Sequence, residues 1–292
     1  MALQTRDLGA ALGTEVLGID LSEPLSDAQF EDIRQLVSRR GVLVFRDQQL
    51  APARQVEFSK RLGPLKVPPL VDHWVLEGHP EVMRISNIVV DGHHIGNPDA
   101  GVLWHSDGAY QPVPSMYTLL HCLEIPRGAD GRTLGNTLFA STAAAWDALP
   151  ADRQRQLLGL RARHSLAWEY EQKAASGLMK REQMSDADRH HKVPEVVHPL
   201  VRTHPLTGQQ CLYLSEGVTI GIEGMDDAAA RALIAELNAW ASSERFVYRH
   251  EWQVGDFVFW DNCPTKHRAL FDYDLPQRRL MHRTTVAGSA PF

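Results

Sequence analysis

The stretch Trp104-His105-Ser106-Asp107 places an imidazole and a carboxylate two residues apart. In an extended strand the side chains of residues i and i+2 point to the same face, so both groups can reach one metal ion. His267, far along the chain, supplies a third candidate ligand. Two histidines and one carboxylate leave open positions on a metal, which is typical of non-haem Fe(II) oxygenases. We therefore expect a metal site formed by His105, Asp107 and His267.

The segments around these residues read as strands, because they are short, apolar and rich in β-branched and aromatic side chains. The expected strands are Val42–Phe45, Tyr117–Leu123, Gln210–Leu214, Phe246–Trp252, Asp256–Trp260 and Arg279–Val286. They lie far apart in the sequence, so their pairing must be largely non-local. This pattern favours a mainly β fold, a sandwich or barrel flanked by helices, over alternating βαβ units.

Helices are expected beside these strands. Ser26 and Gln29 form a capping box for a helix over Ser26–Arg40, which Gly41 can end. Further helices are expected at Pro52–Leu62, Ser141–Leu149, Ala151–Leu158 and Asp226–Ser242. With no repeat and no long linker, we expect a single domain over residues 1–292. The polar stretch at about 169–194 reads as a lid or insertion, since it is longer than ordinary connections.

Composition excludes several classes of protein. The chain has 292 residues with 43% hydrophobic and 23% charged side chains, an ordinary globular mixture. A net charge of −6 gives no basic surplus for nucleic acid, and there is no apolar run long enough to span a membrane. Three widely spaced cysteines form neither a disulfide framework nor a zinc ribbon. The first ten residues lack the apolar core of a signal sequence, so we expect a cytoplasmic protein.

The last expected strand carries two arginines on one face. With a two-residue period, Arg279, Met281 and Arg283 share a side, while His282 points to the other. Guanidinium groups inside a barrel are costly unless each finds an anion. Arg side chains bind carboxylates and sulfonates through paired hydrogen bonds. A metal and two inward arginines therefore indicate two small anionic molecules in one cavity.

Together these stretches resemble the taurine/2-oxoglutarate dioxygenase family, which includes the 2,4-dichlorophenoxyacetate dioxygenases. The resemblance runs from Gly13 almost to the C-terminus. The matching motifs, in family order, are Leu103-Trp104-His105-Ser106-Asp107-Gly108, Gly135-Asn136-Thr137-Leu138-Phe139-Ala140, Val197-His198-Pro199-Leu200-Val201-Arg202-Thr203-His204-Pro205, Trp260-Asp261-Asn262 and Gln277-Arg278-Arg279-Leu280-Met281-His282-Arg283. The resemblance implies a double-stranded β-helix (jelly roll) with flanking helices, and it allows a homo-oligomer.

The resemblance also implies the cofactors and their ligands. Fe(II) would be held by His105, Asp107 and His267, with 2-oxoglutarate and O2 as co-substrates. Arg279 and Thr137 would bind the distal carboxylate of 2-oxoglutarate, although Thr133, in a small insertion, is a rival to Thr137. An intact Asp107 argues for hydroxylation of a C–H bond and against halogenation, in which a small residue replaces that carboxylate. The products would be succinate, CO2 and an oxidised substrate.

The expected substrate is a small anionic molecule. Arg283 matches the family position that binds the substrate anion, and Tyr110, Tyr170 and Val218 are expected to line a roomy, aromatic pocket. Taurine itself is doubtful, because Pro68 stands about where taurine enzymes have a sulfonate-binding histidine. Lys66 or His73 could replace that histidine.

Two other functions remain open alongside hydroxylation of an organic acid. Natural-product tailoring, including isonitrile-forming oxidation of amino-acid derivatives, is an alternative in the same enzyme class. A non-catalytic jelly roll that binds an organic acid is an alternative in another class. Other histidines, including His121, His198 and His204, are expected to be structural.

Overall fold

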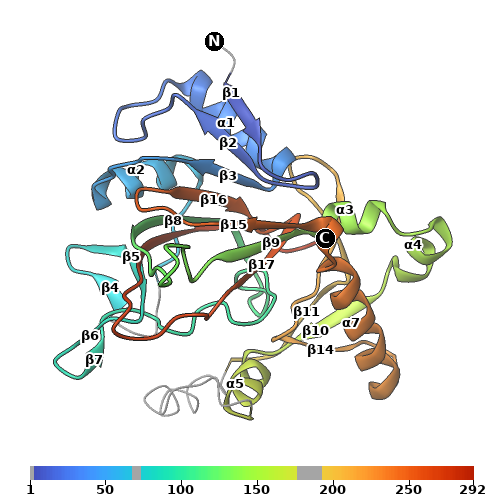
Figure 1. Ribbon diagram of the computed structural model, residues 1–292. Coiled ribbons are helices and arrows are strands. Elements are labelled where there is room, and N and C mark those ends of the chain that lie inside the picture. The colour runs from blue at the N-terminus through green and yellow to red at the C-terminus, as the bar shows by residue number, and fades with distance from the viewer. Residues whose placement is uncertain (1–2, 68–73, 176–192) are drawn as a thin grey trace.

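A computed structural model describes residues 3–67, 74–175 and 193–292. Its largest sheet has eight strands in the order β1-β2-β3-β16-β8-β18-β5-β4 (Figure 1). The strands of this main sheet are β1 (Gln4–Asp7), β2 (Thr14–Leu17), β3 (Val42–Phe45), β4 (Val75–Leu76), β5 (His79–Ser86), β8 (Ser115–Glu124), β16 (Phe257–Asp261) and β18 (Leu280–Ala287). All neighbouring pairs are antiparallel except β2 and β3.

A smaller antiparallel sheet faces the main one and completes the β-helix. Its strands, in spatial order, are β15 (Val247–His250), β9 (Thr137–Ser141) and β17 (Thr265–Ala269). Apolar side chains from both sheets, including Val44, Leu120, Phe139, Trp260 and Met281, form one buried cluster. This packing of two β layers on a shared interior is the double-stranded β-helix that the motifs imply.

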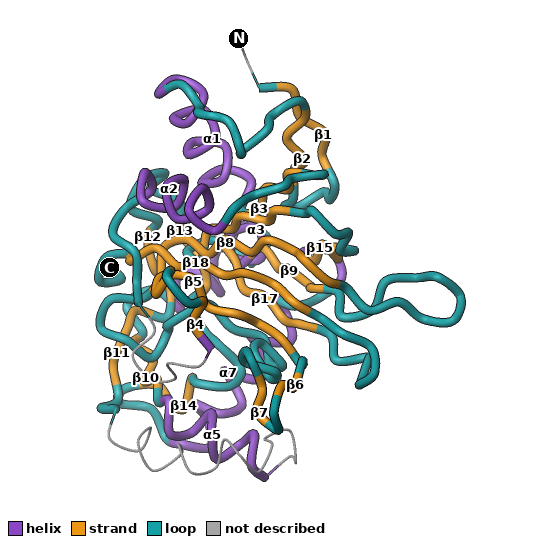
Figure 2. Tube along the Cα trace, turned by 90° about the vertical axis from the view of Figure 1, so that its left-hand side faces the viewer, coloured by secondary structure: helices purple, strands orange, loops and turns teal. Residues whose placement is uncertain are grey.

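Two helices cover the outer face of the main sheet. They are α1 (Asp27–Arg40) and α2 (Pro52–Leu62). Ile33 and Phe58 pack there against Leu119 and Phe259 of the sheet, in a second buried cluster. The expected capping box of α1 is present, and Gly41 ends the helix with φ of 73°. Figures 1 and 2 both show these helices on the opposite side of the strands from the remaining helical elements.

Most of the remaining elements form a subregion beside the small sheet, around a third apolar cluster, whereas the hairpin of β6 and β7 lies apart from it near β4 (Figure 1). Three short sheets are β10 with β11 and β14, β12 with β13, and the hairpin of β6 with β7. The bounds are β6 (Val89–Val90), β7 (His93–His94), β10 (Arg161–His164), β11 (Val196–Pro199), β12 (Val201–Thr203), β13 (Gln210–Leu212), β14 (Thr219–Ile222), α3 (Thr142–Asp147), α4 (Ala151–Leu157), α5 (Leu166–Ala175), α7 (Asp227–Ala241) and the 3-10 helix Glu244–Phe246.

The structure corrects several expected boundaries. The strand expected at Phe246–Trp252 is limited to Val247–His250, because a 3-10 helix ends at Phe246. The helix expected at Ser141–Leu149 is shorter, with Ser141 serving as its cap. Much of the expected lid at 169–194 lies outside the described residues. Within the described part of the chain, no helix is long and apolar enough to cross a membrane.

Candidate active site

The structure brings His105, Asp107 and His267 together along the edge strand β17 of the small sheet. His267 lies on β17, and its backbone exchanges two hydrogen bonds with that of His105, at 3.0 and 2.8 Å. Potential ligand atoms of the three side chains all lie within 4.8 Å of one another. His105 belongs to this single bridge and Asp107 to the turn after it, so the expected extended strand is wrong. The turn nevertheless brings both side chains to the same point.

Hydrogen bonds orient the ligands. The Nδ1 atom of His105 lies 2.8 Å from the carbonyl of Leu103, which accepts its proton and leaves the Nε2 lone pair free for a metal. Thr118 donates to Oδ2 of Asp107 at 2.6 Å. Asn262 accepts from the Asp107 amide and donates to Thr118. These contacts fix the carboxylate before any metal binds.

The charges at the site favour the metal-binding protonation states. Burial alone would raise the pKa of Asp107, but Arg283 and the two histidines outweigh it and hold the pKa well below its usual value. Burial and the neighbouring His105 hold the pKa of His267 well below its usual value. At neutral pH the carboxylate is therefore ionised and His267 is neutral, as metal ligation requires. Two imidazoles and one carboxylate fit a divalent iron with open positions.

A small cavity of about 50 Å³ adjoins these ligands. The expected site residues among those lining it are His105, Thr137, His267, Arg279 and Arg283. Arg279 is only 5% exposed, its Nε has no hydrogen-bond partner, and no carboxylate of the described residues pairs with it. Thr137 accepts a hydrogen bond from Nε1 of Trp252 at 3.0 Å. The rival Thr133 bonds Asn136 and does not line this cavity.

Two glycines make room for the functional side chains. A Cβ atom on Gly135 would lie 2.8 Å from the ring of Tyr273 and 3.1 Å from Cδ of Arg279. A Cβ atom on Gly101 would lie 3.2 Å from the ring of His105. Both glycines have positive φ, 67° and 83°, which disfavours any larger residue. The close packing of Arg279 and His105 therefore depends on these two positions.

The expected substrate residues Tyr110 and Val218 do not line the cavity beside the metal ligands. Val218 packs with Ala109 and Tyr213, and Tyr110 lies against this group. Burial, with the negative charge of Glu169, raises the pKa of Tyr110 to about 12, so its phenol stays protonated. Tyr170 lies half-buried on α5, and it does not line the cavity beside the metal ligands.

Lys66 is a second cation on this side of the site. Its ammonium group donates to Oε1 of Gln111 at 2.5 Å and to the carbonyl of Val113 at 2.8 Å. Burial lowers the pKa of Lys66 to about 8, with the charge of Asp107 opposing this shift and that of Arg283 adding to it. The charge of Lys66 therefore interacts with that of the metal ligand Asp107. Pro68 and His73, the other positions considered for this role, lie outside the described residues.

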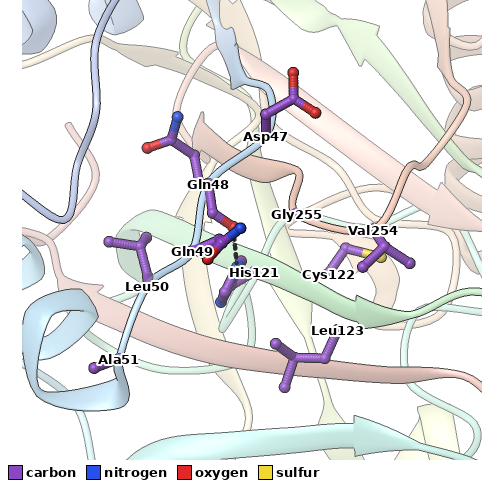
Figure 3. A pocket seen from close by; sticks show the side chains of 10 residues that line it. All are labelled: Asp47, Gln48, Gln49, Leu50, Ala51, His121, Cys122, Leu123, Val254 and Gly255. Carbon is purple, nitrogen blue, oxygen red and sulfur yellow. Dashed lines mark hydrogen bonds between the residues drawn. The ribbon is translucent and has the colours of Figure 1, made fainter.

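The other histidines have contacts within the fold. Nε2 of His204 lies 2.9 Å from Asp261, and Nε2 of His198 lies 3.0 Å from the carbonyl of Gln111. His282 faces away from the cavity, as the strand period predicts. His121 lies at a separate, open pocket of about 530 Å³, where its Nε2 bonds the carbonyl of Gln48 (Figure 3).

The sequence did not predict the residues that support the ligands. Thr118 lies within a strand whose pattern shows only burial. Its hydroxyl reaches Asp107 because the Asp107 turn lies beside the start of β8, where the Ser115 amide donates to the Asp107 carbonyl at 3.1 Å. Asn262 was visible only as part of the Trp260-Asp261-Asn262 motif. Each role depends on non-local pairing, which no local pattern encodes.

Comparisons with known proteins agree with this geometry. The family model described as "Taurine catabolism dioxygenase TauD, TfdA family" matches residues 4–285. The α-ketoglutarate-dependent 2,4-dichlorophenoxyacetate dioxygenase of Cupriavidus pinatubonensis is 34% identical, over 99% of both chains. Pentalenolactone F synthase of Streptomyces arenae is 32% identical, over 97% of this chain and 94% of its own.

Solved structures are similar over the whole length. A taurine dioxygenase-like protein described as putative, from Burkholderia xenovorans, has a TM-score of 0.81 at 29% identity, covering 99% of this chain and 94% of its own. The structure of AAD-2 with Mn(II) and N-oxalylglycine has a TM-score of 0.80 at 30% identity, covering 100% and 99%. The chain therefore belongs to the TauD/TfdA family and is an α-ketoglutarate-dependent dioxygenase with a metal triad of His105, Asp107 and His267.

Proposed function

We propose that this dioxygenase hydroxylates a C–H bond of a small organic acid whose anionic group is bound by Arg283 and Lys66. The observation that carries the proposal is an excess of positive charge beside the metal site. Arg283 lies 2.7 Å from Oδ1 of Asp107, and the charges of Lys66, Arg283 and Asp107 interact. Asp107 pairs with Arg283 alone, and a substrate anion would balance the charge of the nearby Lys66.

Arg279 and Thr137 are proposed to bind the distal carboxylate of 2-oxoglutarate. A buried guanidinium without a carboxylate partner is unfavourable by itself, and a bidentate carboxylate would satisfy it. Thr137 lines the same cavity and has a hydroxyl proton to donate, since its oxygen already accepts from Trp252. The absence of Thr133 from the cavity lining favours Thr137 for this role.

Fe(II) is proposed as the metal held by His105, Asp107 and His267. When bound, it supplies the activation of dioxygen, coupled to conversion of 2-oxoglutarate into succinate and CO2, and one oxygen atom enters the substrate. The chain's contribution is orientation and exclusion of water. Arg279 positions the keto acid, and Arg283 with Lys66 positions the substrate. Apolar walls from Leu120 and Trp260 limit water in the cavity.

Tyr110, Tyr170 and Val218 are proposed to contact the organic body of the substrate. Tyr110 and Val218 belong to one apolar and aromatic group, and the charges of Arg283 and Asp107 act on Tyr110. Such a group suits a carbon skeleton larger than that of taurine. An aromatic carboxylic acid matches this surface, and the name of one relative gives such a substrate, 2,4-dichlorophenoxyacetate.

Natural-product tailoring is a second candidate, because a pentalenolactone F synthase is nearly as similar. The family membership argues against the non-catalytic binding protein considered from the sequence. Cytoplasmic location and a homo-oligomeric state stay predictions.

The proposal is tested by measuring succinate formation with a panel of carboxylates, sulfonates and amino-acid derivatives. Wild-type protein is compared with Arg283→Leu, Lys66→Met and a control, Arg278→Leu, whose side chain is exposed. We expect KM for the accepted acid to rise at least tenfold in the first two variants, with substrate-independent turnover of 2-oxoglutarate retained. Unchanged KM in Arg283→Leu would show that another group binds the anion. A preference for uncharged substrates would refute the proposed substrate class.

A further inference from the structure

We propose that Cys211 and Cys263 are an oxidisable dithiol that hydrogen peroxide converts into an intramolecular disulfide. The two residues are far apart in sequence, and no local pattern pairs them. In the structure Cys211 lies on β13 and Cys263 in the turn between β16 and β17. With Ala143 they form one buried packed cluster. The third cysteine, Cys122, belongs to a different cluster.

The groups around the pair make the two thiols unequal. Arg202 is 3% exposed, its Nε has no hydrogen-bond partner, and no carboxylate of the described residues pairs with it. The neighbouring Cys211 thiol and the positive charges of Arg202 and His204 lower the pKa of Cys263, against the opposing effects of burial and of the Asp261 charge. The neighbouring Cys263 thiol and burial raise the pKa of Cys211. In the proposal Cys263 is the attacking thiolate and Cys211 the second partner.

The reaction is balanced with peroxide as the oxidant. The Cys263 thiolate attacks one peroxide oxygen, the O–O bond breaks, and the departing hydroxide takes a proton to become water. This leaves a sulfenic acid on Cys263. The sulfur of Cys211 then attacks that of Cys263, the S–O bond breaks, and hydroxide leaves with the Cys211 proton as a second water. Two thiols are oxidised by two electrons, and one peroxide is reduced to two waters.

Access to the pair depends on local opening, because both side chains are at most 1% exposed. Cys211 follows the exposed turn 205–208, and its sulfur contacts the carbonyl of Gln209 at 3.7 Å. Its strand belongs to a sheet of only two strands, β12 and β13, which is separate from the two sheets of the β-helix. Opening of this hairpin would expose Cys211 while the β-helix stays folded.

The position of the pair links it to the metal site. Asn262, next to Cys263 in the chain, accepts a hydrogen bond from the Asp107 amide at 3.2 Å. A disulfide would therefore join β13 to the turn that supports Asp107 and leads into the strand carrying His267. Cys122 lies outside this pair, and burial raises the pKa of its thiol to about 12.

The test treats the folded full-length protein with hydrogen peroxide, blocks remaining thiols with N-ethylmaleimide after denaturation, and maps the peptides by mass spectrometry. We expect a peptide pair joined through Cys211 and Cys263, lighter by two hydrogens than the thiols, with Cys122 alkylated. In Cys211→Ser, dimedone should trap a sulfenic acid on Cys263. The matched control, Cys122→Ser, should form the same disulfide as wild type.

Two results would overturn the proposal. One is wild-type protein, folded by circular dichroism, in which Cys211 and Cys263 both remain alkylated after peroxide while Cys122 is oxidised. The other is a disulfide that forms only between molecules. Because the wild-type chain gives the decisive result, the proposal does not depend on the folding of a variant.

Discussion

Replacement of Arg279 by leucine tests the co-substrate site most directly. In the proposed complex the guanidinium makes a bidentate contact with a carboxylate. Removing one partner of a buried, hydrogen-bonded charge pair costs about 2–5 kcal/mol of binding energy. Since about 1.4 kcal/mol is a factor of ten, the Kd for 2-oxoglutarate should rise by about 30-fold to about 4,000-fold. The thermal stability of the protein without 2-oxoglutarate should not fall in the same variant.

Arg279 has no carboxylate partner among the described residues, so its removal leaves no buried acid unpaired. Replacing a buried unpaired charge by an apolar side chain is neutral or stabilising. We therefore expect the Tm of Arg279→Leu to equal or exceed that of wild type. Arg278→Leu is the matched control, because its ion pair with Glu124 is exposed and worth about 1 kcal/mol or less.

The assay is an anaerobic titration of the Fe(II)-loaded protein with 2-oxoglutarate, followed through the visible band that keto-acid chelation produces. Thermal unfolding is measured on the same variants. An Arg279→Leu protein that binds 2-oxoglutarate as tightly as Arg278→Leu would refute the assignment. A large loss of Tm in Arg279→Leu would show that the guanidinium has a structural partner instead.

Three further predictions concern neighbouring groups. Thr137→Val should weaken 2-oxoglutarate binding about tenfold in the same titration, because one hydrogen bond to a charged group is worth about 1.5–3 kcal/mol. Thr133→Val should leave the binding unchanged. Weaker binding in Thr133→Val and unchanged binding in Thr137→Val would exchange the roles of the two residues. Thr118→Val should lower metal affinity about tenfold by equilibrium dialysis, because supporting bonds to ligands such as Asp107 have effects of about that size; equal affinity would contradict it. Burial lowers the pKa of His164 to about 3 in the folded protein, whereas an unfolded histidine has a pKa of about 6.5. Between these two pH values the unfolded chain binds one more proton than the folded protein. The free energy of unfolding therefore falls as the pH falls through this range. His164→Asn should reduce this loss by about 1.4 kcal/mol between pH 7.5 and pH 5.5, measured by urea unfolding at both pH values; an equal loss in the variant would refute it.

The sequence predicted those elements whose causes are local. The capping box at Ser26 and the glycine at position 41 gave the bounds of α1 to within one residue. The strand period placed Arg279 and Arg283 toward the interior and Arg278 toward solvent, as the structure has them. Such features depend on residues a few positions apart, which a pattern can report.

The parts that the sequence could not predict depend on contacts between distant segments. The His105–Asp107 stretch was expected as a strand, but it pairs through a single bridge to β17 and then turns. Lys66 could be suspected, yet only the pairing of its segment with β18 brings it near Arg283. The contact of Cys211 with Cys263 likewise follows from tertiary packing alone.

The backbone bridge between His105 and His267 has a consequence for how this fold diversifies. The two histidines are hydrogen-bonded main chain to main chain, so their separation is set by the ladder and is insensitive to side chains elsewhere. Mutations in the surrounding loops can change the shape of the pocket while the metal geometry is inherited intact. Relatives named for 2,4-dichlorophenoxyacetate, for a sulfonate and for pentalenolactone F share about 30% identity with this chain. New substrates can thus be acquired in evolution without rebuilding the catalytic metal centre.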